Sequence, residues 1–198
     1  MNRTYFLKLL RQQFFPILKA EGFVIAKQNA KRSNHPLVHI VNIQDSKYGN
    51  ACFINLGAHL DFLPAEGGLD VPFELLQEIE CAFRDRLHPP QGKAFGWAYG
   101  EDEAQAQLTV QQIIQSWQSP NNTFFKQFAS HPESFSQLIK QNPAETQRGH
   151  LLPFARIAFQ LNKPELAKNF ALMGREKVSV HATSYIANCE EIIKQCEA

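Results

Sequence analysis

Hydrophobic and polar positions along the chain predict a helix at the start and strands after it. Residues 4–20 place their apolar side chains on one helical stripe, and Pro16 inside that stripe predicts a kink or an early stop near Phe15. Residues 23–26 form a short apolar run, which predicts a strand, and residues 27–36 are polar and basic, which predicts a turn or loop.

The strongest local pattern is a β-hairpin formed by residues 37–44 and 51–60, whose connection contains Tyr-Gly-Asn. Side chains alternate between the two faces of a strand, so each strand has an apolar half and a half that mixes apolar residues with amides or imidazole. We expect one face to pack on helices and the other to be partly open. The first strand carries Leu37, His39, Val41 and Ile43 on one side, and Val38, Ile40, Asn42 and Gln44 on the other.

A second helix is predicted after the hairpin, capped by Asp70 and running to the break at Pro89. On a helix, Arg84 and Arg86 would point to different faces, and we expect one of them to anchor a carboxylate or backbone carbonyls. Residues 93–99 are predicted to be a last short strand or a loop.

Helical patterns dominate the rest of the chain. Residues 101–119 form a predicted helix, and residues 121–129 and 132–140 form shorter helical pieces. A helical hairpin follows, similar to one tetratricopeptide-type unit, whose second helix is predicted to end at Gly174, and a third helix comes after it.

Together these elements predict an α+β fold, in which an antiparallel sheet of three to five strands packs on helices. The predicted α+β domain spans residues 1–145, and residues 146–198 form a helical C-terminal appendage packed on it.

Charge and composition exclude several classes of partner. The 198 residues include 20 basic and 19 acidic side chains, for a formal net charge of +1. Such a balance argues against nucleic acid and against an anionic membrane surface as partners.

The N-terminal residues show no signal-peptide pattern. The spacing of Cys189 and Cys196 on one predicted helix prevents a disulfide between them. We therefore expect the protein to be located in the reducing cytoplasm. The sixteen Phe residues predict a core rich in aromatic rings.

Motifs for catalysis are missing from the sequence. It contains no phosphate-binding loop, nucleophile elbow, His-Glu-x-x-His or Cys-x-x-Cys pattern. One two-ligand geometry stays open, because His39 and His59 lie on adjacent predicted strands with Asp61 close in sequence. Apart from that alternative, we expect no catalytic residue, metal or other cofactor.

The order of several short motifs resembles the bacterial family called domain of unknown function 4304. In that family a helix ending in Leu-Lys-x-x-Gly-Phe leads to a hairpin with Asn-x-Gln, Tyr-Gly and Phe-x-Ile/Val-Asn-x-Gly, and then to Arg-x-Arg-Leu. The resemblance covers about residues 5–120. The matching residues are Lys19, Gly22, Phe23, Asn42, Gln44, Tyr48, Gly49, Phe53, Asn55, Gly57, Arg84, Arg86 and Leu87.

The resemblance implies a small cytoplasmic bacterial protein without an assigned reaction, and some members look like immunity proteins that neutralise toxins. We therefore expect a binding protein that occludes a cognate secreted or contact-delivered toxin. Two alternatives are a small metal-dependent hydrolase using His39, His59 and Asp61, and an adaptor that binds a peptide through the helical tail. The predicted contact residues for a partner are Asn42, Gln44, Asn55, Arg84, Arg86 and Trp97.

Overall fold

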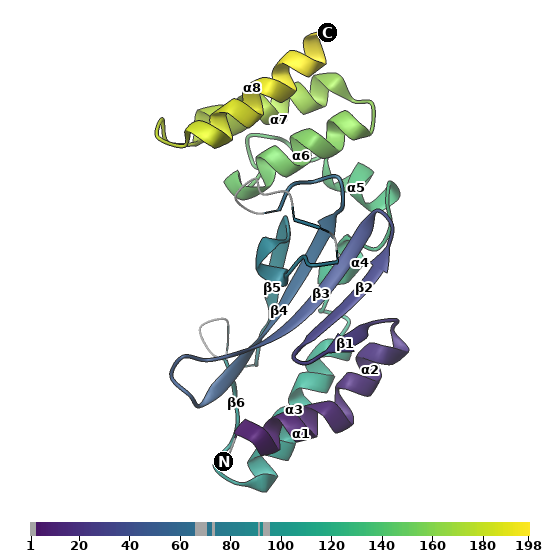
Figure 1. The fold of residues 1–198 in the computed structure, drawn as a ribbon, viewed down its shortest axis with the longest axis vertical. Coiled ribbons are helices and arrows are strands. Elements are labelled where there is room, and N and C mark those ends of the chain that lie inside the picture. Colours follow the sequence, from purple (N-terminus) through teal and green to yellow (C-terminus); the bar gives the residue numbers. More distant parts are fainter. Residues whose placement is uncertain (1–2, 66–70, 73, 91, 93–95) are drawn as a thin grey trace. The chain divides into compact units, whose positions relative to one another are not determined.

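The computed structural model of the chain shows an α+β protein that divides into two compact units (Figure 1). Unit 1 comprises Met1–Asp61 and Phe73–Lys126, and unit 2 comprises Phe62–Pro72 and Gln127–Ala198. The predicted boundary after residue 145 lies inside unit 2. The structure describes residues 3–65, 71–72, 74–90, 92 and 96–198.

A single antiparallel sheet organises unit 1, and it contains six strands among the described residues. The α+β class with an antiparallel sheet is therefore confirmed, although the sheet has more strands than the three to five that were expected. Its order is β1-β2-β3-β4-β5, with β6 paired to the first residues of β4. The strands are β1 (Val24–Ala26), β2 (Asn29–Asn34), β3 (Leu37–Asp45), β4 (Ala51–Leu60), β5 (Phe83–Leu87) and β6 (Trp97–Ala98).

The predicted hairpin is the centre of this sheet. Strands β3 and β4 pair along their whole length, with Asn42 opposite Asn55. The chain reverses through the expected turn, where the N–H of Gly49 donates to the carbonyl of Ser46 at 3.0 Å. Gly49 has φ +85, a left-handed conformation that glycine adopts without steric cost.

Strand β2 replaces the loop that was predicted for residues 27–36. It pairs with β1 on one side and with β3 on the other. Its composition is not typical of a strand, because only Ala30 is buried, while Lys31 and Arg32 are half-buried. The Arg32 guanidinium lies over the Phe23 ring, 4.6 Å from its centre. Polar composition is therefore compatible with a strand that has one open face.

The prediction of a helix that ends before Pro89 is wrong as well. Its last part is strand β5, which pairs with β4, and a 3-10 turn, η1 (Glu78–Glu80), precedes it. The spacing of apolar residues suits a helix, but Ile79 on that stripe is 60% exposed. Phe83 and Leu87 are buried on one face of β5, which pairs with β4 from Ala58 to Ile54. As a result Arg84 and Arg86 lie on the same face of a strand, not on different faces of a helix. Asp70, the predicted cap, lies outside the described residues.

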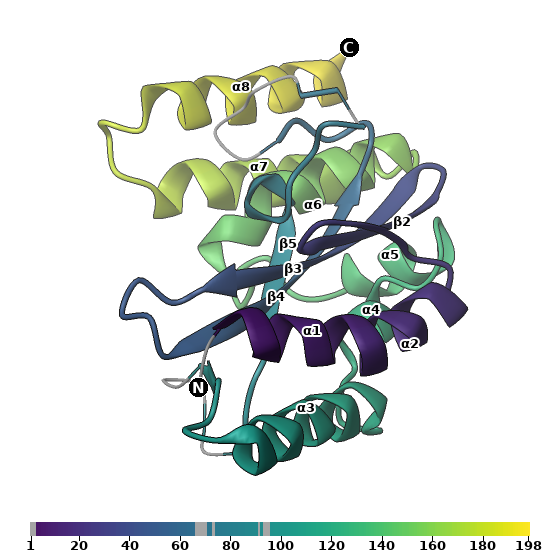
Figure 2. The same ribbon diagram turned by 60° about the horizontal axis from the view of Figure 1, so that its bottom comes forward.

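Helices cover the apolar face of the sheet in unit 1. The first predicted helix is interrupted near Phe15 as expected, giving two helices, and Figure 2 shows them with α3 on one side of the sheet. Aromatic rings fill the space beneath, including Phe14 and Trp117, whose ring centres are 5.5 Å apart. This confirms the ring-rich core. The helices are α1 (Arg3–Gln13), α2 (Phe15–Ala20), α3 (Glu103–Gln118) and the short α4 (Phe124–Gln127).

Unit 2 is helical in its described residues. Gly174, the predicted end of the second tail helix, instead lies inside it. A Cβ at Gly174 would stand 3.2 Å from the Tyr185 hydroxyl and 3.3 Å from Cys189 Sγ, so the missing side chain permits close helix packing. Within the described residues, no helix combines the length and the hydropathy that a membrane span requires. The helices are α5 (Glu133–Leu138), α6 (Arg148–Gln160), α7 (Pro164–Lys177) and α8 (Thr183–Glu197).

Candidate functional site

The sheet of unit 1 presents a second face, opposite the one covered by α1, α2 and α3, on which polar side chains gather. Cross-strand pairing puts Asn29 opposite Asn42, Asn42 opposite Asn55, and Asn55 opposite Arg86. Directly paired residues share a face, so one row of polar side chains runs across four strands. We call this surface the polar face; it comprises Val24, Asn29, Lys31, Asn42, Gln44, Phe53, Asn55, Gly57, His59, Arg84 and Arg86.

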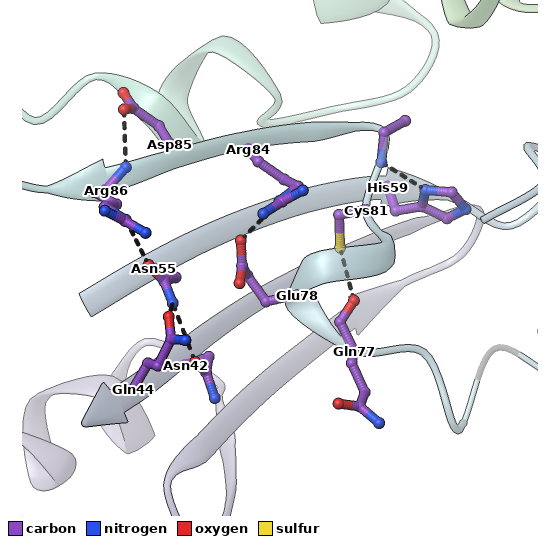
Figure 3. A network of polar contacts seen from close by, with 11 residues as sticks. Asn42, Gln44, Asn55, His59, Gln77, Glu78, Cys81, Arg84, Asp85 and Arg86 are labelled. Atoms are coloured by element: carbon purple, nitrogen blue, oxygen red, sulfur yellow. Dashed lines mark hydrogen bonds and ion pairs between the residues drawn. The ribbon is translucent and has the colours of Figure 1, made fainter. Parts of the chain in front are cut away.

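Hydrogen bonds join the amides of this row into a continuous ladder. The Nδ2 of Asn55 donates to Asn42 Oδ1 at 3.2 Å and to Gln44 Oε1 at 2.9 Å (Figure 3). Asn42 Nδ2 in turn donates to Asn29 Oδ1 at 2.6 Å. Asn55 is 5% exposed, whereas Gln44 and Asn29 are exposed. The amide ladder, which we define as Asn29, Asn42, Gln44 and Asn55, is therefore anchored at a buried residue and opens to solvent on both sides.

Arg86 completes the row on strand β5. Its Nε donates to Asn55 Oδ1 at 2.9 Å. Its guanidinium carbon lies 4.5 Å from the centre of the Phe53 ring, a cation–π geometry. The side chain is nevertheless exposed. One hydrogen bond and one aromatic ring thus orient a guanidinium that remains accessible to solvent.

Arg84, on the same face, has a different environment. Its Nε donates to the carboxylate of Glu78 at 3.0 Å, and that carboxylate side chain is only 7% exposed (Figure 3). A buried carboxylate needs such a partner, because an unpaired charge in a protein interior is costly. Arg84 therefore neutralises Glu78 and holds η1 on the sheet, the anchoring role that the sequence predicted for one of the two arginines.

The turn that contains η1 covers the polar face at Gly57. A Cβ on Gly57 would lie 2.8 Å from Cys81 Sγ and 3.3 Å from Glu78 Cγ, so only glycine fits beneath this turn. Next to it, Nδ1 of His59 accepts a hydrogen bond from the backbone N–H of Ala82 at 3.0 Å. Burial raises the pKa of the Cys81 thiol, so Cys81 is protonated at neutral pH and acts as a packing group.

Five of the six predicted contact residues come together on the polar face, and the sixth does not. Asn42, Gln44, Asn55, Arg84 and Arg86 share it. Trp97 is 2% exposed, and its Nε1 donates to the carbonyl of Leu87 at 2.9 Å. The expectation that Trp97 contributes to an exposed contact surface is therefore wrong, because burying its ring in the core and satisfying its N–H fix it in the interior.

The geometry proposed for a metal centre is also wrong. His39 pairs with Ala58 and His59 pairs with Val38, so the two imidazoles point to opposite faces of the sheet. On the helix-covered face, His39 Nδ1 accepts from Arg32 Nη2 at 2.9 Å.

The third predicted ligand is engaged elsewhere, since Asp61 forms an ion pair with His35. In the described part of the chain, no three His, Cys, Asp or Glu side chains are grouped so that they could hold a metal.

Two residues that contact the predicted row, Asn29 and Phe53, are not among the predicted contacts. Asn29 falls in the segment for which the sequence predicts a turn or loop, and Phe53 matches the family motif without being a predicted contact. The alternation of residues 51–60 does place Phe53 and Asn55 on the same side, which is the available signal. Asn29 joins this row only because residues 29–34 form strand β2, which pairs Asn29 with Asn42.

Comparisons with known proteins complete these observations. No curated protein and no solved structure shows significant similarity to the chain. One family does match, over residues 14–119, a range that contains all the described strands and the polar face. Since this match covers more than half of the sequence, the chain belongs to the family described as a domain of unknown function, DUF4304.

Proposed function

We propose that this chain binds a protein partner through the polar face of its sheet. The observation that carries the proposal is the amide ladder with Arg86 stacked on Phe53 at its end. Protein interfaces favour arginine and aromatic anchors surrounded by hydrogen-bonding groups. A ladder already ordered by its own hydrogen bonds loses little conformational entropy when a partner docks on it.

Exposed apolar side chains on the polar face and on the turn that covers it support the same function. Val24 is 74% exposed and pairs with Lys31 on the polar face, while Ile79, 60% exposed, projects from the turn that covers Gly57. Exposed aliphatic groups beside ordered polar groups provide the mixed surface that protein partners bury.

The charges of the face favour a protein over nucleic acid. The described part of the polar face carries the cations Lys31, Arg84 and Arg86, and Arg84 is already paired with Glu78. Binding a phosphate backbone requires several cations that neutralise successive phosphates. The formal net charge of +1 for the whole chain adds no broad positive field.

In its specific form, the proposal is that the chain acts as an immunity protein, occluding a cognate secreted or contact-delivered bacterial toxin in the cytoplasm. The family resemblance motivates this role. All four cysteines are free thiols, which suits a reducing compartment.

The test uses the protein encoded by the neighbouring gene, which the immunity role requires to be a toxin, and two matched variants of this chain. Ile79→Glu places a charge on the turn that covers the polar face at Gly57, and Leu108→Glu places the same charge on α3, where Leu108 is 54% exposed. We expect Ile79→Glu to weaken binding at least about tenfold in calorimetry and to abolish rescue on co-expression, because a buried unpaired charge disrupts an interface.

Leu108→Glu is expected to bind and rescue like the wild type. Equal binding by both variants, or loss only with Leu108→Glu, would refute the polar face as the interface. A neighbouring gene that encodes no toxin, or a toxin that the chain does not neutralise, would refute the immunity role.

A further inference from the structure

We propose that Arg86 is a carboxylate-binding site that receives an Asp or Glu side chain of the protein partner. This proposal rests on the proposed protein-binding function and deepens it by naming the chemistry of the contact. It follows from the direction of the hydrogen bonds in the ladder.

Arg86 fixes the orientation of every amide in the ladder. A guanidinium only donates, so the group of Asn55 that faces Arg86 Nε must be its oxygen. The Nδ2 of Asn55 then faces Asn42 and Gln44, whose oxygens must accept from it. This reasoning settles which end of each amide is nitrogen, an assignment that otherwise depends on inference from the network.

The consequence is a face with a surplus of donors. The side-chain oxygens of Asn55, Asn42 and Gln44 all accept hydrogen bonds from within the ladder. Within the described contacts, Gln44 Nε2 and the two Nη groups of Arg86 donate to no protein acceptor. A ligand that matches this surface must supply acceptors, and a carboxylate offers two oxygens without any donor.

The Arg86 side chain is also held in an orientation that suits carboxylate binding. Its Nε donates to Asn55, and its guanidinium carbon lies over the Phe53 ring. These contacts keep the Nη groups in place for a charge-assisted hydrogen bond, so less conformational entropy is lost on binding than for a free arginine.

Carboxylates of the chain itself do not occupy this position in the described structure. Glu78 is engaged by Arg84. Asp85 lies on the other face of β5, pairing opposite Leu56, and its Oδ1 accepts from the backbone N–H of Arg86 at 2.8 Å. A single oriented guanidinium of this kind suits one carboxylate group, not a polyanion.

The experiment needs no partner protein. The side-chain Nε–Hε resonance of Arg86 is followed by NMR while N-acetylglutamate N-methylamide is added. The same titration is run with N-acetylglutamine N-methylamide, which has the shape of the first probe but an amide in place of the carboxylate, and with inorganic phosphate.

We expect saturable shifts with the carboxylate probe and at least about tenfold weaker binding of the amide probe, because charge assistance is lost. Arg86→Lys keeps the charge but not the planar guanidinium, and we expect it to weaken carboxylate binding at least about fivefold. Arg11→Lys, at an exposed position of α1, is the matched control and should change nothing.

Equal binding of both glutamate-derived probes, or full carboxylate binding by Arg86→Lys, would overturn the proposal. Tighter binding of phosphate than of carboxylate would overturn it as well and would point to a phosphorylated ligand. These outcomes are separable from failure of the proposed function, because the Ile79→Glu comparison measures partner binding independently of the probes.

Discussion

Gly57→Ala tests how the turn containing η1 is seated on the polar face. A methyl group at this position would lie 2.8 Å from Cys81 Sγ, 3.2 Å from Cys81 Cβ and 3.3 Å from Glu78 Cγ. The first of these distances is too short for any carbon–sulfur contact, so the turn or the strand must move. Overpacking of this kind costs about 1–3 kcal/mol of unfolding free energy, and that is the loss we expect.

Cys81→Ala is the second single variant of a double-mutant cycle with Gly57→Ala. Alone, it removes one buried sulfur and should cost about 1 kcal/mol, comparable to one buried methylene. In the double variant the shortest contact disappears, and the remaining contacts, 3.2 Å to the Cys81 Cβ and 3.3 Å to Glu78 Cγ, require only a small shift. We therefore expect the double variant to be more stable than the sum of the single effects predicts, by about 1 kcal/mol or more.

Urea unfolding followed by tryptophan fluorescence measures the free energy of unfolding of unit 1, in which Gly57 lies. Both tryptophans, Trp97 and Trp117, belong to unit 1, as does Gly57. Gly149→Ala in unit 2, where a Cβ would meet nothing within 4 Å, is the control and should leave the fluorescence transition unchanged. A Gly57→Ala variant as stable as the wild type, or purely additive effects in the cycle, would refute the packing described for this turn.

Three further predictions concern the ladder, an ion pair and unit 2. Asn55→Leu removes the centre of the amide ladder and should lower unfolding free energy by about 1–3 kcal/mol in the same fluorescence assay; an unchanged midpoint would contradict this. A hydrogen bond from Arg3 lowers the pKa of Asp45, so its stabilising contribution is present above the ordinary carboxyl pKa of about 4 and is lost as pH falls through the lowered value. Asp45→Asn should therefore flatten the acid limb of stability below about pH 4, and identical limbs would refute the linkage. Gly174→Leu should destabilise unit 2 by about 1–3 kcal/mol, seen as faster hydrogen exchange in residues 164–197, and unchanged exchange would contradict the close helix packing.

The hairpin and most helices were predictable because their signals are local. Alternation over residues 37–44 and 51–60, with a glycine turn between them, determines the pairing without help from the rest of the chain. Likewise, Pro16 is enough to interrupt the first helix, since its ring removes a backbone donor.

Strands β2 and β5 were missed because their conformation depends on neighbours. Residues 83–87 fit both helical and strand spacing, and pairing with the edge of β4 decides between them. The same tertiary contact determines that Arg84 and Arg86 share a face, so five residues of the candidate site could be predicted but not their arrangement.

The predicted approach of His39 and His59 as metal ligands is wrong for a related reason. Whether His39 and His59 meet depends on register, and a shift of one residue moves a side chain to the other face. The observed pairing of His39 with Ala58 separates the two imidazoles. Trp97 could not be placed from its sequence alone, because its burial depends on packing against other parts of unit 1.

Hydrogen–deuterium exchange of the chain, alone and with the protein encoded by the neighbouring gene, tests most directly whether the polar face is the proposed binding surface. We predict that this partner slows exchange in residues 42–44, 53–57 and 84–86 more than in α1 or α3, because docking covers the ladder and Arg86. Slower exchange confined to α6, α7 and α8 would instead identify the helical tail as the binding element, and that result, or unchanged exchange on the polar face, would contradict the proposed function.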